Sequence, residues 1–131
     1  MGTEHSSTRL ATIYIVDDDD AVRDSLRMLL EAESFTVFDF ASGAEFLQLA
    51  GLEKQCCLLL DVDMPGMSGL EVLEHIRRDN SDIPVMLMTG CPSSAIETAA
   101  ACAGTALIEK PFRPGELLDA IKRTLRGSSL P

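Results

Sequence analysis

Uninterrupted apolar runs along the chain predict strands that are buried on both faces. The clearest run, from Cys56 to Leu60, contains no polar residue and ends abruptly at Asp61. Continuous runs of this kind are typical of a parallel sheet, because helices cover both of its faces. Shorter or mixed runs predict four more strands, over residues 11–16, 35–40, 84–88 and 105–108.

Apolar residues at helical spacing follow each predicted strand. The stripes expected to be buried are Val22, Leu26, Leu29 and Leu30, then Phe46, Leu47 and Leu49 or Ala50, then Leu70, Leu73 and Ile76, then Ile96, Ala99, Ala100 and Ala103, and finally Leu117, Leu118, Ile121 and Leu125. Ser42 with Glu45, and Ser94 with Glu97, have capping-box spacing and predict two helix starts. Strands that alternate with helices indicate right-handed βαβ units, and therefore an α/β fold with a parallel sheet.

Length and charge favour a single acidic domain. The chain has 131 residues and a formal net charge of −10, and a chain of this length can form one core. Nucleic acid and anionic lipid would repel it, so we expect no direct nucleic-acid binding and no membrane association. We expect residues 1–10 to form a disordered leader, 11–126 the folded domain, and 127–131 a tail or the start of a linker.

The cysteines indicate a reducing compartment. Cys56, Cys57, Cys91 and Cys102 include no Cys-x-x-Cys pair and have no histidines at metal-binding spacing. Three of them fall within apolar segments. This pattern predicts reduced core thiols in a cytosolic protein rather than a redox site.

Polar residues follow four of the five predicted strands. Asp17 and Asp18 follow the first, Asp61 the third, Thr89 the fourth and Lys110 the fifth. The carboxyl ends of parallel strands share one edge of a sheet, so these side chains can converge there. Neighbouring carboxylates repel unless protons or a cation neutralise them, and a hard cation such as Mg²⁺ prefers oxygen ligands.

A magnesium site of this kind usually also binds phosphate, which indicates phosphoryl chemistry. Thr89 and Lys110 are suitable donors for phosphoryl oxygens as charge spreads over them. Asp61 is the predicted nucleophile, because carboxylates can form aspartyl phosphates.

Four strings at separate strand ends carry a family resemblance. IVDDD, LLLDxxMPxMSG, MTG and IEKPF are similar to the CheY-like receiver domains of two-component response regulators, especially those of the FixJ type. The resemblance covers about residues 13–125. It implies a flavodoxin-like (βα)5 three-layer sandwich with five parallel strands in the order 2-1-3-4-5, an arrangement for which CheY is a named example.

The resemblance also implies roles for the site residues. Asp61 would accept a phosphoryl group from a sensor histidine kinase, while Thr89 and Lys110 would bond its oxygens. The metal ligands would be Asp18, Asp61 and the backbone carbonyl of Asp63, with Asp17 acting through a metal-bound water. The Lys110-Pro111 bond would be cis. A receiver of this kind is a cytoplasmic signalling domain rather than an enzyme, with at most self-phosphorylation from small donors and self-dephosphorylation.

The family resemblance further implies an output domain or effector, and a possible homodimer through the helix that begins near Ser94, the strand 105–108 and the last helix. The chain departs from the family pattern at Leu107, where relatives usually have an aromatic residue, and the segment from Thr89 to Lys110 is one residue shorter than usual. These departures leave open a docking module that works without phosphorylation.

A phosphatase is a second alternative. Asp61-Val62-Asp63 after a buried strand also resembles the DxD motif of haloacid-dehalogenase-type phosphatases. Pro65 stands where those enzymes usually have Thr or Val, and the chain is too short for a cap domain over a substrate.

Overall fold

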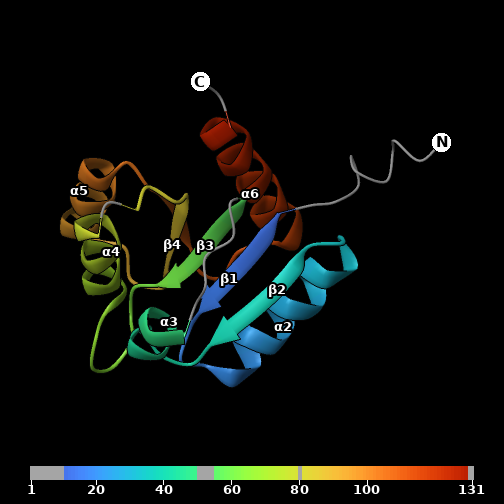
Figure 1. Ribbon diagram of the computed structural model, residues 1–131, viewed down its shortest axis with the longest axis horizontal. Coiled ribbons are helices and arrows are strands. Elements are labelled where there is room, and N and C mark those ends of the chain that lie inside the picture. Colours follow the sequence, from blue (N-terminus) through green and yellow to red (C-terminus); the bar gives the residue numbers. More distant parts are fainter. Residues whose placement is uncertain (1–10, 50–54, 80, 130–131) are drawn as a thin grey trace.

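Five parallel strands form the centre of the molecule. The computed structural model describes residues 11–49, 55–79 and 81–129, and its sheet has the order β2-β1-β3-β4-β5 (Figure 1). The strands are β1 (Thr12–Val16), β2 (Thr36–Phe40), β3 (Cys56–Asp61), β4 (Val85–Thr89) and β5 (Ala106–Glu109). Every neighbouring pair is parallel. The predicted sheet and its strand order are therefore confirmed.

Helices cover both faces of the sheet and make three layers (Figure 1). They are α2 (Asp20–Ala32), α3 (Gly43–Leu49), α4 (Gly69–Arg78), α5 (Ser94–Ala103) and α6 (Pro114–Ser129). Helices α2 and α6 pack on one face, and α3, α4 and α5 pack on the other.

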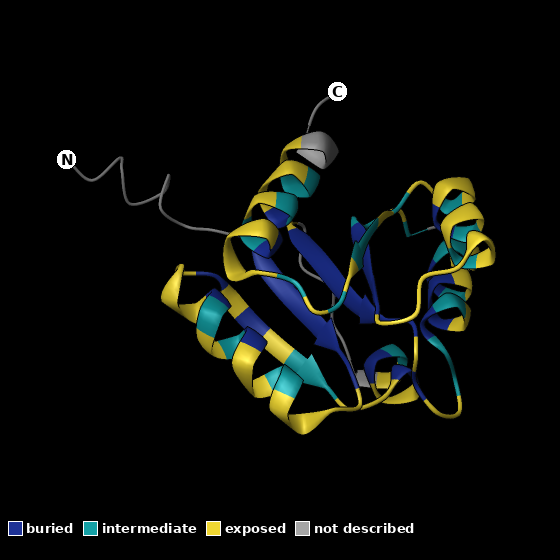
Figure 2. Cartoon of the chain, turned by 180° about the vertical axis from the view of Figure 1, so that it is seen from behind, coloured by how far each residue is buried: buried dark blue, intermediate teal, exposed yellow. Residues whose placement is uncertain are grey.

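The core is divided by the sheet into two apolar clusters. In β3, Leu58 and Leu60 point to the α3–α4–α5 side, and Leu59 points to the α2–α6 side. The strands β1, β3 and β4 are buried along their whole length (Figure 2). This double burial explains why their sequences lack the alternation of a half-exposed strand.

The helix starts follow local capping chemistry, with two differences from the predicted pattern. Ser93, not Ser94, caps α5 by accepting a hydrogen bond from the Ile96 amide. At α3, Ser42 Oγ accepts from the Glu45 amide, but the Glu45 carboxylate accepts from the amide of Ala41. A complete capping box instead forms at α4, between Ser68 and Glu71.

Three other expectations differ from the structure. On α4 the fully buried residues include Val72, while Leu70 is only half-buried, so the buried stripe is rotated toward Val72. Cys56 and Cys57 are buried free thiols as predicted, but Cys91 and Cys102 are exposed. Helix α6 continues to Ser129, beyond the predicted domain end at residue 126, and the predicted leader lies outside the described residues.

Helix α5 and strand β5 are the least buried part of the core. Ala100 is the buried residue of α5, and in β5 the two central residues are half-buried while the two end residues are exposed. Leu107 is half-buried in β5 and packs against the cluster beneath α3, α4 and α5. This edge of the domain therefore contributes little apolar burial compared with β1 and β3.

Candidate functional site

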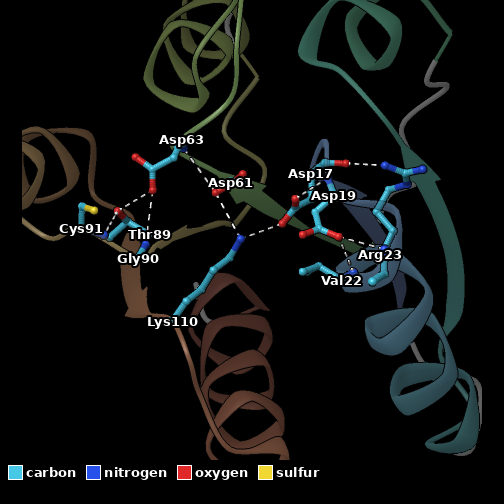
Figure 3. Close-up of polar contacts among 11 residues, drawn as sticks. Asp17, Asp19, Val22, Arg23, Asp61, Asp63, Thr89, Gly90, Cys91 and Lys110 are labelled. Carbon is cyan, nitrogen blue, oxygen red and sulfur yellow. Dashed lines mark hydrogen bonds and ion pairs between the residues drawn. The ribbon is translucent and has the colours of Figure 1, made fainter.

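The polar residues predicted from the strand ends gather at the carboxyl edge of the sheet. Figure 3 shows Lys110 reaching between Asp61 and Asp17, with Thr89 and Asp63 on one side and Arg23 on the other. The residues come from β1, β3, β4 and β5 and the loops that follow these strands. The prediction that the parallel strands bring them together is confirmed for Asp17, Asp61 and Lys110.

Asp17 is fixed by four hydrogen bonds directly after β1, one of which its amide donates to the Phe40 carbonyl at 3.2 Å. Its carboxylate is fully buried and accepts from the Asp19 amide (2.9 Å to Oδ1) and from Lys110 Nζ (2.9 Å to Oδ2). Its backbone carbonyl accepts from Arg23 Nη1 at 2.7 Å. Arg23 also pairs with Asp20, so the first turn of α2 holds the end of β1 in place.

Helix α2 also uses one of the four consecutive acids as its cap. Asp19 accepts hydrogen bonds from the amides of Ala21 and Val22. This confirms that one of these acids serves the helix start, where carboxylates stabilise the exposed amides and the helix dipole. Asp18 is exposed to solvent, and with Asp17 it remains available for the site.

Asp61 is the last residue of β3 and is almost completely buried, with 3% of its surface exposed. Lys110 Nζ lies 3.4 Å from its Oδ1, and the Asp63 amide donates to the same oxygen at 3.3 Å. Among the described residues, both hydrogen bonds to the Asp61 carboxylate end on Oδ1. The other carboxylate oxygen, Oδ2, is left for other partners.

Gly69 allows the start of α4 to lie directly against the backbone of Asp61. A Cβ atom at this position would come within 2.3 Å of the Asp61 carbonyl oxygen. The Gly69 amide donates to the carbonyl of Val62 at 3.2 Å. Glycine is needed here for close approach of two backbone segments, and this contact fixes the loop that follows Asp61.

The site concentrates negative charge. One ligand atom from each of Asp17, Asp18 and Asp61 lies within 4.8 Å of the others. Burial, and next the charge of Asp17, raise the pKa of Asp61, although Lys110 opposes the rise. Burial lowers the pKa of Lys110, but its bonds to Asp17 and Asp61 outweigh burial, so the net direction is upward. Lys110 therefore stays protonated and offsets only part of the carboxylate charge.

The three carboxylates fit a hard divalent cation. Their donor atoms are oxygens, which Mg²⁺ prefers, and the exposed Asp18 leaves one side open to the waters that Mg²⁺ usually keeps. A cation would also relieve the repulsion that raises the pKa of Asp61.

Thr89 is placed differently from what the sequence alone suggests. It is the last residue of β4 and is fully buried. Its hydroxyl donates to Asp63 Oδ2 at 2.9 Å and accepts from the Cys91 amide at 3.0 Å. The Gly90 amide donates to the same Asp63 oxygen at 3.3 Å. The backbone carbonyl of Thr89 accepts from the Lys110 amide at 2.7 Å, so both residues are anchored to each other.

Two contacts were missed by the sequence reasoning. One is Arg23 on the carbonyl of Asp17, for which no local pattern exists beyond a basic residue in the first turn of a helix. The other is the Asp63 carboxylate on Thr89 and Gly90. Sequence reasoning assigned the backbone carbonyl of Asp63 to the metal and its carboxylate to the alternative DxD motif, but not to Thr89; the predicted metal-binding role stays a prediction. The cis Lys110-Pro111 bond is confirmed.

The structure is a parallel α/β domain with an acidic cluster at the carboxyl edge of its sheet. Comparison with known families identifies it: the chain matches the family model of the response regulator receiver domain over residues 13–122, and it belongs to this family. The resemblance read from the four sequence strings is therefore confirmed. Receiver domains are signalling domains of two-component systems rather than typical enzymes.

Curated relatives support the same assignment. The response regulator protein TodT of Pseudomonas putida is 37% identical over 126 residues, which cover 95% of this chain and 56% of TodT. The transcriptional regulatory protein FixJ of Azorhizobium caulinodans is 36% identical over 118 residues, which cover 89% of this chain and 56% of FixJ. The chain thus spans about 56% of the length of these relatives.

Solved structures agree with the fold. The crystal structure of FixJ-N has a TM-score of 0.80 at 34% identity, over 88% of this chain and 94% of that one. A CheY-like receiver domain from Methanospirillum hungatei has a TM-score of 0.82 at 33% identity, over 90% and 95% of the two chains. These comparisons favour neither the phosphatase nor the phosphorylation-independent docking module. Within the part of the chain that the structure describes, no helix is both long enough and apolar enough to cross a membrane.

Proposed function

We propose that this receiver domain accepts a phosphoryl group on Asp61 from a sensor histidine kinase and passes the signal to an output domain or partner. The observation that carries the proposal is the position of Asp61: it is buried at the end of β3, 3.4 Å from Lys110 Nζ and in one cluster with Asp17 and Asp18. A carboxylate held this way can act as a nucleophile, and the Lys110 ammonium group lies beside it.

The transfer replaces one bond to phosphorus with another. An oxygen of Asp61 attacks the phosphorus of a phosphohistidine, the P–N bond breaks, and the imidazole leaves with its electron pair and takes up a proton. Oδ2 is the attacking oxygen that the geometry favours, because the hydrogen bonds from Lys110 and the Asp63 amide both end on Oδ1. Thr89 and Lys110 then donate to the phosphoryl oxygens, whose charge grows in a loose transition state.

Asp17, Asp18, Asp61 and the backbone carbonyl of Asp63 would hold Mg²⁺, with Asp17 acting through a bound water. When bound, the cation neutralises phosphoryl charge. Hydrogen bonds from Lys110 and the Asp19 amide hold the Asp17 carboxylate in place, so that Asp17 is already close to Asp61 before a phosphodonor binds.

Residues 11–126 would form the receiver domain, with the segment 127–131 leading out of it. The relatives are longer than this chain, and FixJ is a transcriptional regulatory protein. We therefore expect an attached output domain to receive the signal from the receiver domain. The domain would act in the cytoplasm, would show at most self-phosphorylation from small donors and self-dephosphorylation, and could form a homodimer through α5, β5 and α6.

Mass spectrometry after treatment with acetyl phosphate and Mg²⁺ tests the proposal. We expect one phosphoryl group per chain, located on Asp61, and none on Asp61→Asn. Asp119→Asn is the matched control, because Asp119 is an exposed acid of α6, and it should be labelled like the unmodified chain. Labelling of the Asp61→Asn variant at the normal level would refute the assignment.

A further inference from the structure

The Asp63 carboxylate accepts hydrogen bonds from two donors at the end of β4. Its Oδ2 atom accepts from the Thr89 hydroxyl at 2.9 Å and from the Gly90 amide at 3.3 Å (Figure 3). Asp63 lies in the loop after β3, two residues beyond Asp61, and Thr89 and Gly90 lie at the end of β4. One anionic oxygen therefore joins the two loops that flank the phosphoacceptor.

A hydroxyl has a single proton to donate. The Thr89 proton goes to Asp63, and the Thr89 oxygen accepts one hydrogen bond from the Cys91 amide at 3.0 Å. The same proton cannot also serve a phosphoryl oxygen on Asp61. Phosphoryl binding by Thr89 and retention of the bond to Asp63 are mutually exclusive.

We propose that Asp63 is a positioning residue that acts as an internal latch: it holds Thr89 and the Gly90 amide in the unphosphorylated chain and is displaced when a phosphoryl group claims the same donors. The inference rests on the proposed function, since it is the phosphoryl group on Asp61 that competes with Asp63. The latch makes the unphosphorylated arrangement of the β4–α5 loop more stable, and it weakens the response to a given phosphodonor.

The expected size of the effect follows from the contacts. Asp63 is exposed, so water compensates in part for the bonds it loses, and the net effect is that of one ordinary hydrogen bond. Removing the latch should tighten the binding of beryllofluoride, a phosphoryl mimic, about tenfold in the presence of Mg²⁺.

The experiment compares Asp63→Ala, Asp63→Asn and the control Asp119→Ala in the full chain. Without any phosphodonor, the Gly90 amide resonance should move upfield and its exchange with solvent should become faster in Asp63→Ala, and both should be unchanged in the control. With Mg²⁺ and beryllofluoride, the affinity should increase most for Asp63→Ala and less for Asp63→Asn, because asparagine removes the charge but keeps a side-chain oxygen for Thr89.

The outcomes separate the latch from its alternatives. Equal gains for Asp63→Ala and Asp63→Asn would show simple charge repulsion and overturn the latch. An unchanged Gly90 resonance in Asp63→Ala, or an affinity that stays the same or falls, would overturn it as well. If the unmodified chain binds no beryllofluoride and takes up no phosphoryl group, the proposed function fails instead. In that case the Gly90 resonance still decides whether Asp63 holds the loop.

Discussion

Lys110 is the cation that holds two buried carboxylates together, so its removal should destabilise the fold. Lys110 Nζ lies 2.9 Å from Asp17 and 3.4 Å from Asp61, whose side chains are 1% and 4% exposed. Lys110→Met keeps an unbranched side chain of similar length but removes the charge. In a chelating buffer without Mg²⁺, no other cation of the described residues pairs with the two carboxylates, and only the amides of Asp19 and Asp63 still donate to them.

The magnitude follows from the charges left behind. With an effective dielectric constant of about 20, two unit charges 4.8 Å apart, the largest separation within this cluster, repel by about 3.5 kcal/mol. Removing one partner of a buried ion pair costs about 3–5 kcal/mol in general. Partial exposure of Lys110, at 24%, favours the lower end. We therefore expect Lys110→Met to lower the free energy of unfolding by about 3 kcal/mol at neutral pH.

The loss should depend on pH in a defined direction. The pKa of Asp61 is already raised in the folded chain by burial and by Asp17, and loss of Lys110 removes the group that opposes the rise. A carboxyl with a raised folded pKa destabilises the fold when ionised. Its penalty is absent below its unfolded pKa and develops as the pH rises through the folded value. The variant should therefore be less impaired near about pH 5 than near about pH 7.

Urea unfolding followed by circular dichroism measures this effect. Lys122→Met is the matched control, because Lys122 is an exposed lysine of α6, and it should change stability by less than about 0.5 kcal/mol. Adding Asp17→Asn to Lys110→Met should recover part of the loss, since it removes one of the two repelling charges. A loss below about 1 kcal/mol at neutral pH, or one that grows in acid, would refute the charge argument.

Three other predictions concern the same edge and the core. Mg²⁺ at ten times its dissociation constant should stabilise the chain by about 1.4 kcal/mol and raise Tm by about 5 °C, reversed by chelation; a flat titration would contradict the acidic site. Gly69→Ala should cost about 2–3 kcal/mol in urea unfolding, because its Cβ would lie 2.3 Å from the Asp61 carbonyl oxygen, while Gly115→Ala, with open space around it, serves as control. Burial raises the pKa of Cys57 to about 12, so native Cys57 should resist alkylation while exposed Cys91 reacts; equal modification rates would contradict it.

Much of the acidic edge could be predicted from the sequence because it depends on topology. Once the apolar runs predict parallel strands, the residues after them must lie at one edge of the sheet. Asp17, Asp61 and Lys110 are therefore expected at the same edge of the sheet, and the strand order decides how close together they lie. The strand order itself came from the family resemblance, since local patterns do not determine which strands pair.

The partners of individual side chains could not be predicted in this way. The bond from Thr89 to Asp63 depends on the path of two loops and on the side-chain torsions within them, and no periodic pattern describes either. The α5 cap differed by one residue, because Ser93 and Ser94 are equally good caps in sequence. The predicted α4 stripe included Leu70 in place of Val72, because both are apolar and the sequence alone does not fix which side of the helix faces the sheet.

The weak packing of α5 on the sheet has a consequence for how a partner could recognise this domain. Fully burying one alanine methyl contributes on the order of 1 kcal/mol, and the other apolar contacts of α5, from Ile96 and Ala103, are only partly buried, so the helix is weakly held on the sheet. The end of β4 leads directly into this helix, and a small rearrangement at Thr89 can therefore reshape an outer surface while β1 and β3 keep their places. We therefore expect any change of shape in this domain to be concentrated in α5 and β5, while the buried strands β1 and β3 stay in place.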